Sequence, residues 1–257
     1  MKEAELSFLI NLCYKYNWMQ LPFFYIEDIG NNNELVELDE DTSKHVVGVL
    51  RMKAGERIHL TEGKGNLFTA EIVKDHKKKC VVKLAGTVFT VRDSRKICIG
   101  ISLLKNNNRL EWFLEKATEL GIAEIIPMIC SRTEKQHFRF DRMHNILVSA
   151  MLQSRQVWLP VLHEPIAFEK LMSQEDVAGF TQKFIAHCME GNKASLVDLV
   201  NGSLPSQLIL IGPEGDFTKE EIEMAVQFHF TPVALGDTRL RTETAGVVAA
   251  TLLKLQA

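Results

Sequence analysis

Short apolar runs alternate with polar stretches through the first third of the chain, and glycine, proline and asparagine separate them. Five of these runs predict β-strands, at residues 23–26, 34–38, 57–61, 67–73 and 80–84. Thr42 is the expected cap of one helix, within TSKHVVGVLRM, and residues 62–65 suit a hairpin turn. Five short strands with one helix predict a small closed or partly closed β-barrel.

From residue 97 onward, strand patterns alternate with amphipathic helix patterns. Strands are predicted at residues 97–104, 122–129, 184–187, 208–211 and 233–235. Helices are predicted at residues 109–120, 141–157 and 194–200, and two more begin near residues 218 and 242. This alternation predicts an α/β fold, with a mostly parallel sheet covered by helices on both faces.

Two strand–loop–helix units near the C-terminus are the most informative part of this pattern. In the first, Gly212-Pro213-Glu214-Gly215 follows an all-apolar strand, and Thr218 with Glu221 forms a capping-box pattern. In the second, the loop 236–241 precedes a helix that Thr242 can cap. Neighbouring strand ends of this kind form a ligand crevice at the carboxyl edge of a sheet, whereas each loop alone would suit an ordinary tight turn.

Composition narrows the class of protein. The chain has 257 residues, 46% of them hydrophobic, and no apolar run long enough to cross a bilayer, as in a soluble globular protein. Its five cysteines are scattered without a C-x-x-C pair, which argues against a metal site or a disulfide framework and fits the cytoplasm. The glycine loops match neither a P-loop nor G-x-G-x-x-G, so a dinucleotide cofactor is a poor fit.

Charge is distributed unevenly around a net value of −3. The first 41 residues are strongly acidic, while basic residues cluster at 74–83 and at 132–155. Such clusters attract polyanions, although most charge runs are simply solvated faces. The candidates for phosphate contacts are Lys77, Lys78, Lys79, Arg132, Arg139 and Arg142.

Five separated motifs together carry a specific resemblance. They are HVVGVLRMKAGERI, LEKATELGIAEIIP, QSRQVWLP, IGPEGDF and LRTETA, and the likeness spans residues 20–257 in order. The chain resembles the RsmE family, which are bacterial 16S rRNA (uracil-N3)-methyltransferases of the SPOUT superfamily.

The resemblance implies a fold and partners that spacing does not show. Residues 19–92 would form a PUA-like β-barrel that binds RNA, and residues 93–257 a SPOUT methyltransferase domain whose last segment threads a trefoil knot. Residues 1–18 would be an extension outside the fold. The family implies a homodimer that acts on 16S rRNA in the small ribosomal subunit, at N3 of the uridine at position 1498.

The resemblance also implies a site for S-adenosyl-L-methionine in three loops. The residues carried over are Ala186, His187, Ile211, Gly212, Pro213, Glu214, Gly215, Leu235, Gly236, Leu240, Arg241, Thr242, Thr244 and Ala245. The chain departs from the family pattern at Asp216, where a second glycine is usual, and at Asp237-Thr238.

Three residues are candidates for catalysis of methyl transfer to a weakly acidic ring nitrogen. Arg241 and Arg155 are expected to stabilise negative charge on the uridine, and Glu243 to act as a base, although helix capping also explains Glu243. Two other functions stay open. One is a SPOUT enzyme that methylates the ribose 2′-hydroxyl, and the other is a non-catalytic RNA-binding protein.

Overall fold

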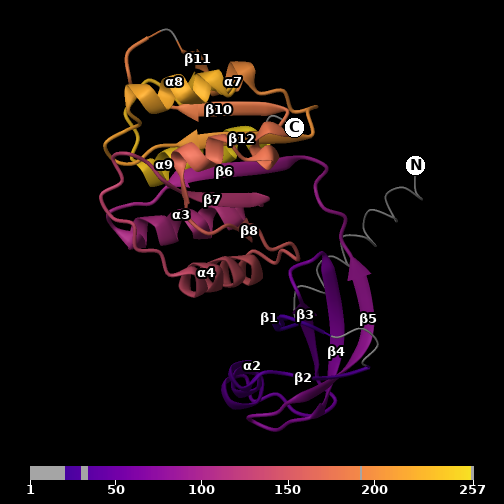
Figure 1. Cartoon of the computed structure of the whole chain (residues 1–257). Helices are drawn as coiled ribbons and strands as arrows, with labels where there is room; N and C mark the ends of the chain where they lie inside the picture. Colours follow the sequence, from indigo (N-terminus) through magenta and orange to yellow (C-terminus); the bar gives the residue numbers. More distant parts are fainter. Residues whose placement is uncertain (1–20, 30–33, 192, 256–257) are drawn as a thin grey trace, which may run out of the picture. The chain divides into compact units, whose positions relative to one another are not determined.

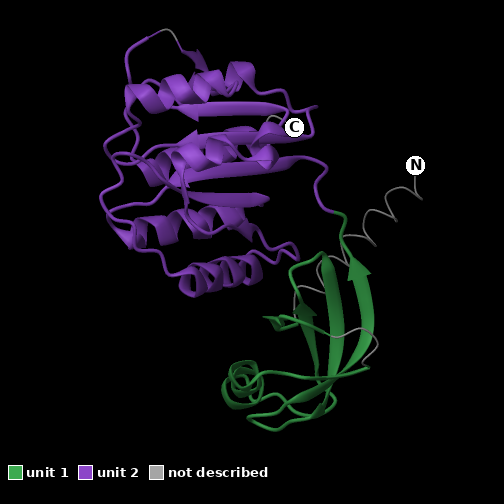
Figure 2. Ribbon diagram, viewed as in Figure 1, with its two compact units in different colours: residues 1–91 green, residues 92–257 purple. Residues whose placement is uncertain are grey.

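The chain folds into two compact units, residues 1–91 and residues 92–257 (Figure 2). The structure is a computed structural model and describes residues 21–29, 34–191 and 193–255. The extension predicted for residues 1–18 lies outside these residues.

The first unit contains one five-stranded sheet around its own apolar core (Figure 1). Its strands lie in the order β1-β3-β4-β5-β2, and all pairs are antiparallel except β1 with β3. This arrangement confirms the five predicted strands as a partly closed barrel, and Gly63 and Gly65 turn β3 into β4 with positive φ angles. The strands are β1 (Phe23–Tyr25), β2 (Leu35–Glu37), β3 (Arg57–Thr61), β4 (Asn66–Lys74) and β5 (Val81–Phe89).

The helical segment of this unit begins earlier than predicted. Asp39, and not Thr42, is the N-cap, because the Asp39 side chain accepts a hydrogen bond of 2.9 Å from the Thr42 backbone nitrogen. The prediction for Thr42 was wrong because an acidic residue three positions earlier caps the helix first. Helix α2 (Glu40–Ser43) continues directly into the π-helical segment η2 (Lys44–Val49), which buries Val46 and Val47 in the core.

The second unit is built on a parallel sheet in the order β11-β13-β10-β12-β6-β7-β8, with β9 also paired to β7. The chain adds β7 and β8 on one side of β6. On the other side, β12 lies between β6 and β10, and β13 lies between β10 and β11, so later strands are inserted between earlier ones. The strands are β6 (Lys96–Ser102), β7 (Glu124–Ile129), β8 (Val161–Leu162), β9 (Ile166–Ala167), β10 (Gln182–Ala186), β11 (Ala194–Ser195), β12 (Ser206–Ile211) and β13 (Thr231–Ala234).

Helices cover both faces of this sheet, as predicted. Alternate residues of β6 and β12 point to opposite faces: Ile99 and Ile209 pack with α3, α4, α7 and α9, while Cys98 and Leu208 pack with α5, α6 and α8. This confirms the α/β class; the knot stays a prediction. The helices are α3 (Asn107–Glu119), α4 (Phe140–Gln153), α5 (Phe168–Met172), α6 (Glu175–Ala178), α7 (Leu196–Leu199), α8 (Lys219–Gln227) and α9 (Thr242–Leu255).

The structure differs from the sequence predictions at several places. Helix α4 ends at Gln153, because Arg155 adopts a left-handed backbone with φ +58° that stops it before Val157. Thr242 is the first residue of α9 and not its cap, since the Arg241 carbonyl accepts the bond from the Ala245 nitrogen at 2.7 Å. Residues 158–183, for which nothing was predicted, hold β8, β9, α5 and α6, which are too short to show a clear period. Within the described ranges, no helix is long and apolar enough to cross a membrane.

Candidate active site

The carboxyl ends of β10, β12 and β13 meet at a cavity of about 660 Å³. Its walls are the loops that follow these strands, together with the start of α9. Parallel strands that sit side by side end at the same sheet edge, which is where α/β proteins bind ligands. The two C-terminal loops singled out in the sequence therefore do lie together.

Most of the residues predicted to bind the cofactor line this cavity. Gly215 and Thr244 are the two that do not. The predicted residues in the lining are Ala186, His187, Ile211, Gly212, Pro213, Glu214, Leu235, Gly236, Leu240, Arg241, Thr242 and Ala245. The lining also includes Cys188 and Asp237-Thr238-Arg239, which lie within the predicted loops but were not named individually. Lys193, Asp216, Val233 and Ala234 line it as well and lie outside the predicted loops.

Neighbouring loops hold the segment Gly212–Phe217 in place. Arg132 donates from Nη1 to the carbonyl oxygens of Gly215 (2.7 Å) and Phe217 (3.3 Å). The Glu214 carboxylate accepts a bond from the Lys105 backbone nitrogen at 3.2 Å. A Cβ atom at Gly212 would lie 3.0 Å from the Phe217 ring, so glycine permits the tight path of this loop.

The capping box predicted for α8 is present, and its glutamate also accepts a hydrogen bond from outside α8. The Thr218 side chain accepts from the Glu221 nitrogen at 3.2 Å, and Glu221 accepts from the Thr218 nitrogen at 2.8 Å. The other carboxylate oxygen of Glu221 accepts from the Ser131 nitrogen at 2.8 Å. Glu221 is buried, and these bonds connect the end of β7 to the loop after β12.

His187 is held neutral in the cavity wall. Burial, with the positive charge of Lys193, lowers the pKa of His187 below its usual 6.5, and Asp216 opposes this shift. The Lys193 ammonium carries only donors, so the contact of 3.3 Å between Lys193 Nζ and His187 Nδ1 makes Nδ1 an acceptor. The imidazole proton therefore lies on Nε2.

The three catalytic candidates lie in different surroundings. Arg241 is exposed and lines the cavity, whereas Arg155 and Glu243 are not part of the lining. Glu243 is buried in the first turn of α9, and its Oε1 lies 3.6 Å from Nε of Arg109 on α3. Only Arg241 thus stands directly at the cavity, and the Arg109 contact carried no signal in the sequence.

Several of the predicted RNA-binding cations already interact with other residues of the chain. Arg142 forms a two-pronged pair with Glu111 at 2.6 and 2.8 Å, which lowers the pKa of that carboxyl. Exposed ion pairs join Lys78 to Glu40 at 3.3 Å and Lys79 to Glu37 at 3.4 Å. Exposed ion pairs are weak enough for RNA phosphates to displace the carboxylates, whereas the Arg132 bonds to Gly215 and Phe217 give that residue a structural role.

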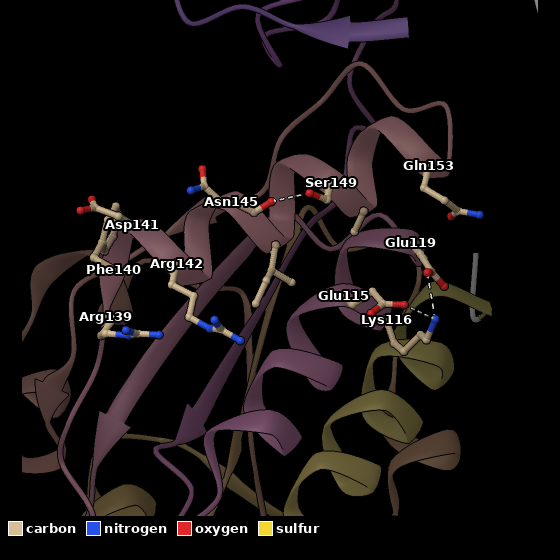
Figure 3. Close-up of a pocket in the computed structure, with 12 residues that line it drawn as sticks. Glu115, Lys116, Glu119, Arg139, Phe140, Asp141, Arg142, Asn145, Ser149 and Gln153 are labelled. Carbon is tan, nitrogen blue, oxygen red and sulfur yellow. Dashed lines mark hydrogen bonds and ion pairs between the residues drawn. The ribbon is translucent and has the colours of Figure 1, made fainter. Parts of the chain in front are cut away.

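A second, more open groove lies between α3 and α4 (Figure 3). Charged side chains line much of it, including Arg139 and Arg142 near the start of α4 and Lys116, which bonds both Glu115 and Glu119. It shares no lining residue with the cavity at the strand ends. Among the described residues, no group of histidine, cysteine, aspartate and glutamate side chains could hold a metal ion.

Comparison with known protein families identifies the class of protein to which the chain belongs. Residues 92–254 match the family model described as RNA methyltransferase domain, and residues 38–85 match the RNA methyltransferase PUA domain. The chain belongs to this family of RNA methyltransferases.

Individual relatives make the assignment finer and confirm the RsmE resemblance. A probable rRNA-methyltransferase from Porphyromonas gingivalis is 34% identical, with a TM-score of 0.84 over 92% of this chain and 98% of that one. Ribosomal RNA small subunit methyltransferase E from Neisseria gonorrhoeae, solved bound to S-adenosyl methionine, is 26% identical, with a TM-score of 0.80 over the same shares. The Bacillus subtilis protein of the same name is 27% identical over 228 residues, 82% of this chain and 86% of that protein.

Proposed function

We propose that this protein transfers a methyl group from S-adenosyl-L-methionine to N3 of a uridine in 16S rRNA, at position 1498, within the small ribosomal subunit. The observation that carries the proposal is the cavity at the ends of β10, β12 and β13, lined by Gly212–Glu214 and Leu240–Thr242. The N. gonorrhoeae relative, which was solved with S-adenosyl methionine, supports the choice of ligand.

The cavity fits such a ligand in size and in chemistry. A volume of about 660 Å³ falls within the range usual for small-molecule sites. Apolar strand ends, among them Ile211 and Val233, suit an adenine ring, and glycines leave backbone groups accessible. S-adenosylmethionine carries two positive groups and a carboxylate, and Asp216, Glu214 and Arg241 supply charges of both signs around the cavity.

The chain's own residues must deal with the proton and the charge of the uracil ring. When bound, S-adenosylmethionine would supply an electrophilic methyl group to the N3 lone pair, with S-adenosylhomocysteine as the leaving group. The N3 proton has to leave, and Arg241, which lines the cavity, is our candidate to stabilise the negative charge that develops on the uracil oxygens. Glu243 remains the candidate base and Arg155 the second candidate charge stabiliser, although neither lines the cavity.

Recognition of the RNA is proposed to combine shape and charge. The target base must leave its stack to reach the cavity, as in other enzymes that modify bases. Lys77, Lys78, Lys79, Arg139 and Arg142 are exposed enough to contact phosphates, which adds affinity without reading sequence. We propose that the protein works in the cytoplasm as a homodimer.

Titration calorimetry with S-adenosylmethionine tests the site. The wild-type protein is expected to bind the ligand at one site per chain, and Arg241→Ala to lower methyl transfer sharply while the melting temperature stays unchanged. A protein that binds small subunits but no S-adenosylmethionine would instead be an RNA-binding module, and the proposal would be wrong.

A further inference from the structure

Asp216 occupies an unusual backbone position beside the cavity. Its φ is +64°, in the left-handed region that favours glycine, and its nitrogen bonds the Pro213 carbonyl at 2.9 Å to close a tight turn. Aspartate tolerates this region better than most residues but gains no conformational advantage over glycine there. The side chain must therefore contribute something that glycine could not.

The carboxylate of Asp216 connects two cavity loops. Its Oδ1 accepts from the Phe217 nitrogen and its Oδ2 from the Cys188 nitrogen, both at 2.8 Å. The first bond stays within the loop after β12, whereas the second crosses to the loop after β10. Hydrogen bonds to an ionised acceptor are stronger than neutral ones. A glycine at this position could form the same turn but would remove this hydrogen bond between the two loops.

Lys193 holds the same loop from its other end. Its ammonium group donates to the carbonyl oxygen of His187 at 2.8 Å, to the carbonyl oxygen of Met189, and lies 3.3 Å from His187 Nδ1. An ammonium group has three donors, so these three acceptors use all of them. Lys193 therefore fixes the local fold of the loop and is not available to bind an anion, while Asp216 fixes where the loop sits relative to the segment Gly212–Phe217.

We propose that Asp216 is a positioning residue that sets the affinity of the cavity for S-adenosylmethionine by fixing the wall formed by Ala186, His187 and Cys188. The inference rests on the proposed function, because it assigns that ligand to the cavity. Without the Asp216 link, the wall moves away from the segment Gly212–Phe217, and binding has to order it again. The effect acts on binding and not on the transfer step.

Two variants of Asp216 separate the link from the turn. Asp216→Gly keeps the left-handed turn and removes both side-chain bonds. Asp216→Asn keeps the size and one acceptor oxygen, so it can satisfy only one of the two backbone nitrogens. The control is Glu223→Gln, which removes an exposed carboxylate that lies on α8, outside both loops, and pairs with Lys219.

Hydrogen–deuterium exchange on the protein without ligand tests the hydrogen bond between Asp216 and Cys188 directly. Exchange at the Cys188 amide is expected to be about tenfold faster in Asp216→Gly than in the wild type, and intermediate in Asp216→Asn, as for loss of a bond to a charged acceptor. The control should leave it unchanged. Calorimetry should give the same order, with the dissociation constant for S-adenosylmethionine rising several-fold in Asp216→Gly, while kcat at saturating ligand changes by less than about twofold.

The outcomes distinguish this inference from the proposed function. If Asp216→Gly binds S-adenosylmethionine as tightly as the wild type and its Cys188 amide exchanges no faster, the positioning role is wrong. If kcat falls and the dissociation constant stays unchanged, Asp216 acts on the transfer step and the role is also wrong. If the wild type itself does not bind S-adenosylmethionine, the proposed function fails, and faster Cys188 exchange in Asp216→Gly still establishes the link between the loops.

Discussion

Arg132, in the loop after β7, donates a 2.7 Å hydrogen bond from Nη1 to the carbonyl oxygen of Gly215, in the loop after β12. The aliphatic part of the same side chain packs against Gly215, where an added Cβ would lie 3.3 Å from Arg132 Cδ. A residue predicted to contact RNA phosphates therefore also supports the backbone of the segment Gly212–Phe217 beside the cavity. This contact gives Arg132 a role in the cavity that the cluster of basic residues did not predict.

Arg132→Ala is expected to weaken S-adenosylmethionine binding. Loss of two bonds from a charged donor should raise the dissociation constant roughly three- to tenfold. This increase is at the low end of what such bonds contribute, because the guanidinium group is exposed. Calorimetry measures the change, with Lys219→Ala as a control that removes an exposed cation from the start of α8. If Arg132→Ala weakens binding to small subunits alone and leaves ligand affinity unchanged, Arg132 contacts RNA and does not support the loop.

Cys188 offers a chemical readout of cavity occupancy. It lines the cavity and is exposed, whereas Cys80, Cys98 and Cys130 are buried. In a Cys13→Ser background, which removes the cysteine outside the described residues, iodoacetamide should label one thiol. S-adenosylmethionine should slow that labelling in proportion to the fraction of protein bound. Equal labelling rates with and without saturating ligand would place the ligand elsewhere.

Gly246 marks a close approach between α9 and α3. A Cβ atom there would lie 2.5 Å from Cε2 of the fully buried Phe113, whose ring has no free space to move. Gly246→Ala is expected to destabilise the second unit by about 1–3 kcal/mol through overpacking, and thermal unfolding measures it. Gly179→Ala is the matched control, because its Cβ meets only ordinary contacts at 3.5 Å or more.

The Glu111–Arg142 pair should make stability depend on pH on the acidic side. The bonds from Arg142 lower the pKa of Glu111 below its usual 4.5 in the folded protein, despite an opposing effect of burial. The stabilisation is therefore complete above pH 4.5 and is lost as pH falls through the lowered pKa. Glu111→Gln should melt slightly below the wild type at pH 7, and the difference should vanish in strong acid. A difference that grows on acidification would contradict the pairing.

The sequence predicted the parts of the fold whose signals are local. The apolar run Leu208–Ile211 and the capping box of Thr218 and Glu221 both lie where they were expected. Residues 158–183 were not predicted, because strands of two residues and helices of four or five show no period. Tertiary contacts, and not local preference, shape that stretch.

The candidate site also has a part that the sequence predicted and a part that it did not. Loops directly after strands were predicted to converge, because parallel strands end at one edge, and most of their residues do line the cavity. The contacts of Cys188 and Lys193 were not predicted. The Cys188 nitrogen bonds Asp216, which is distant in the sequence, and Lys193 follows a loop without a regular pattern. The contact of Arg109 with Glu243 joins two helices more than a hundred residues apart and leaves no trace in spacing.

The most direct test of the central claim is the nucleoside product. Small ribosomal subunits from cells that lack this methylation would be incubated with the protein and S-adenosylmethionine labelled in the methyl group, and the 16S rRNA then digested to nucleosides. The account predicts that the label is recovered as N3-methyluridine from one position, and that Arg241→Ala abolishes most of it. Label recovered as a 2′-O-methylated nucleoside, or no label where a known enzyme of this specificity succeeds, would contradict it.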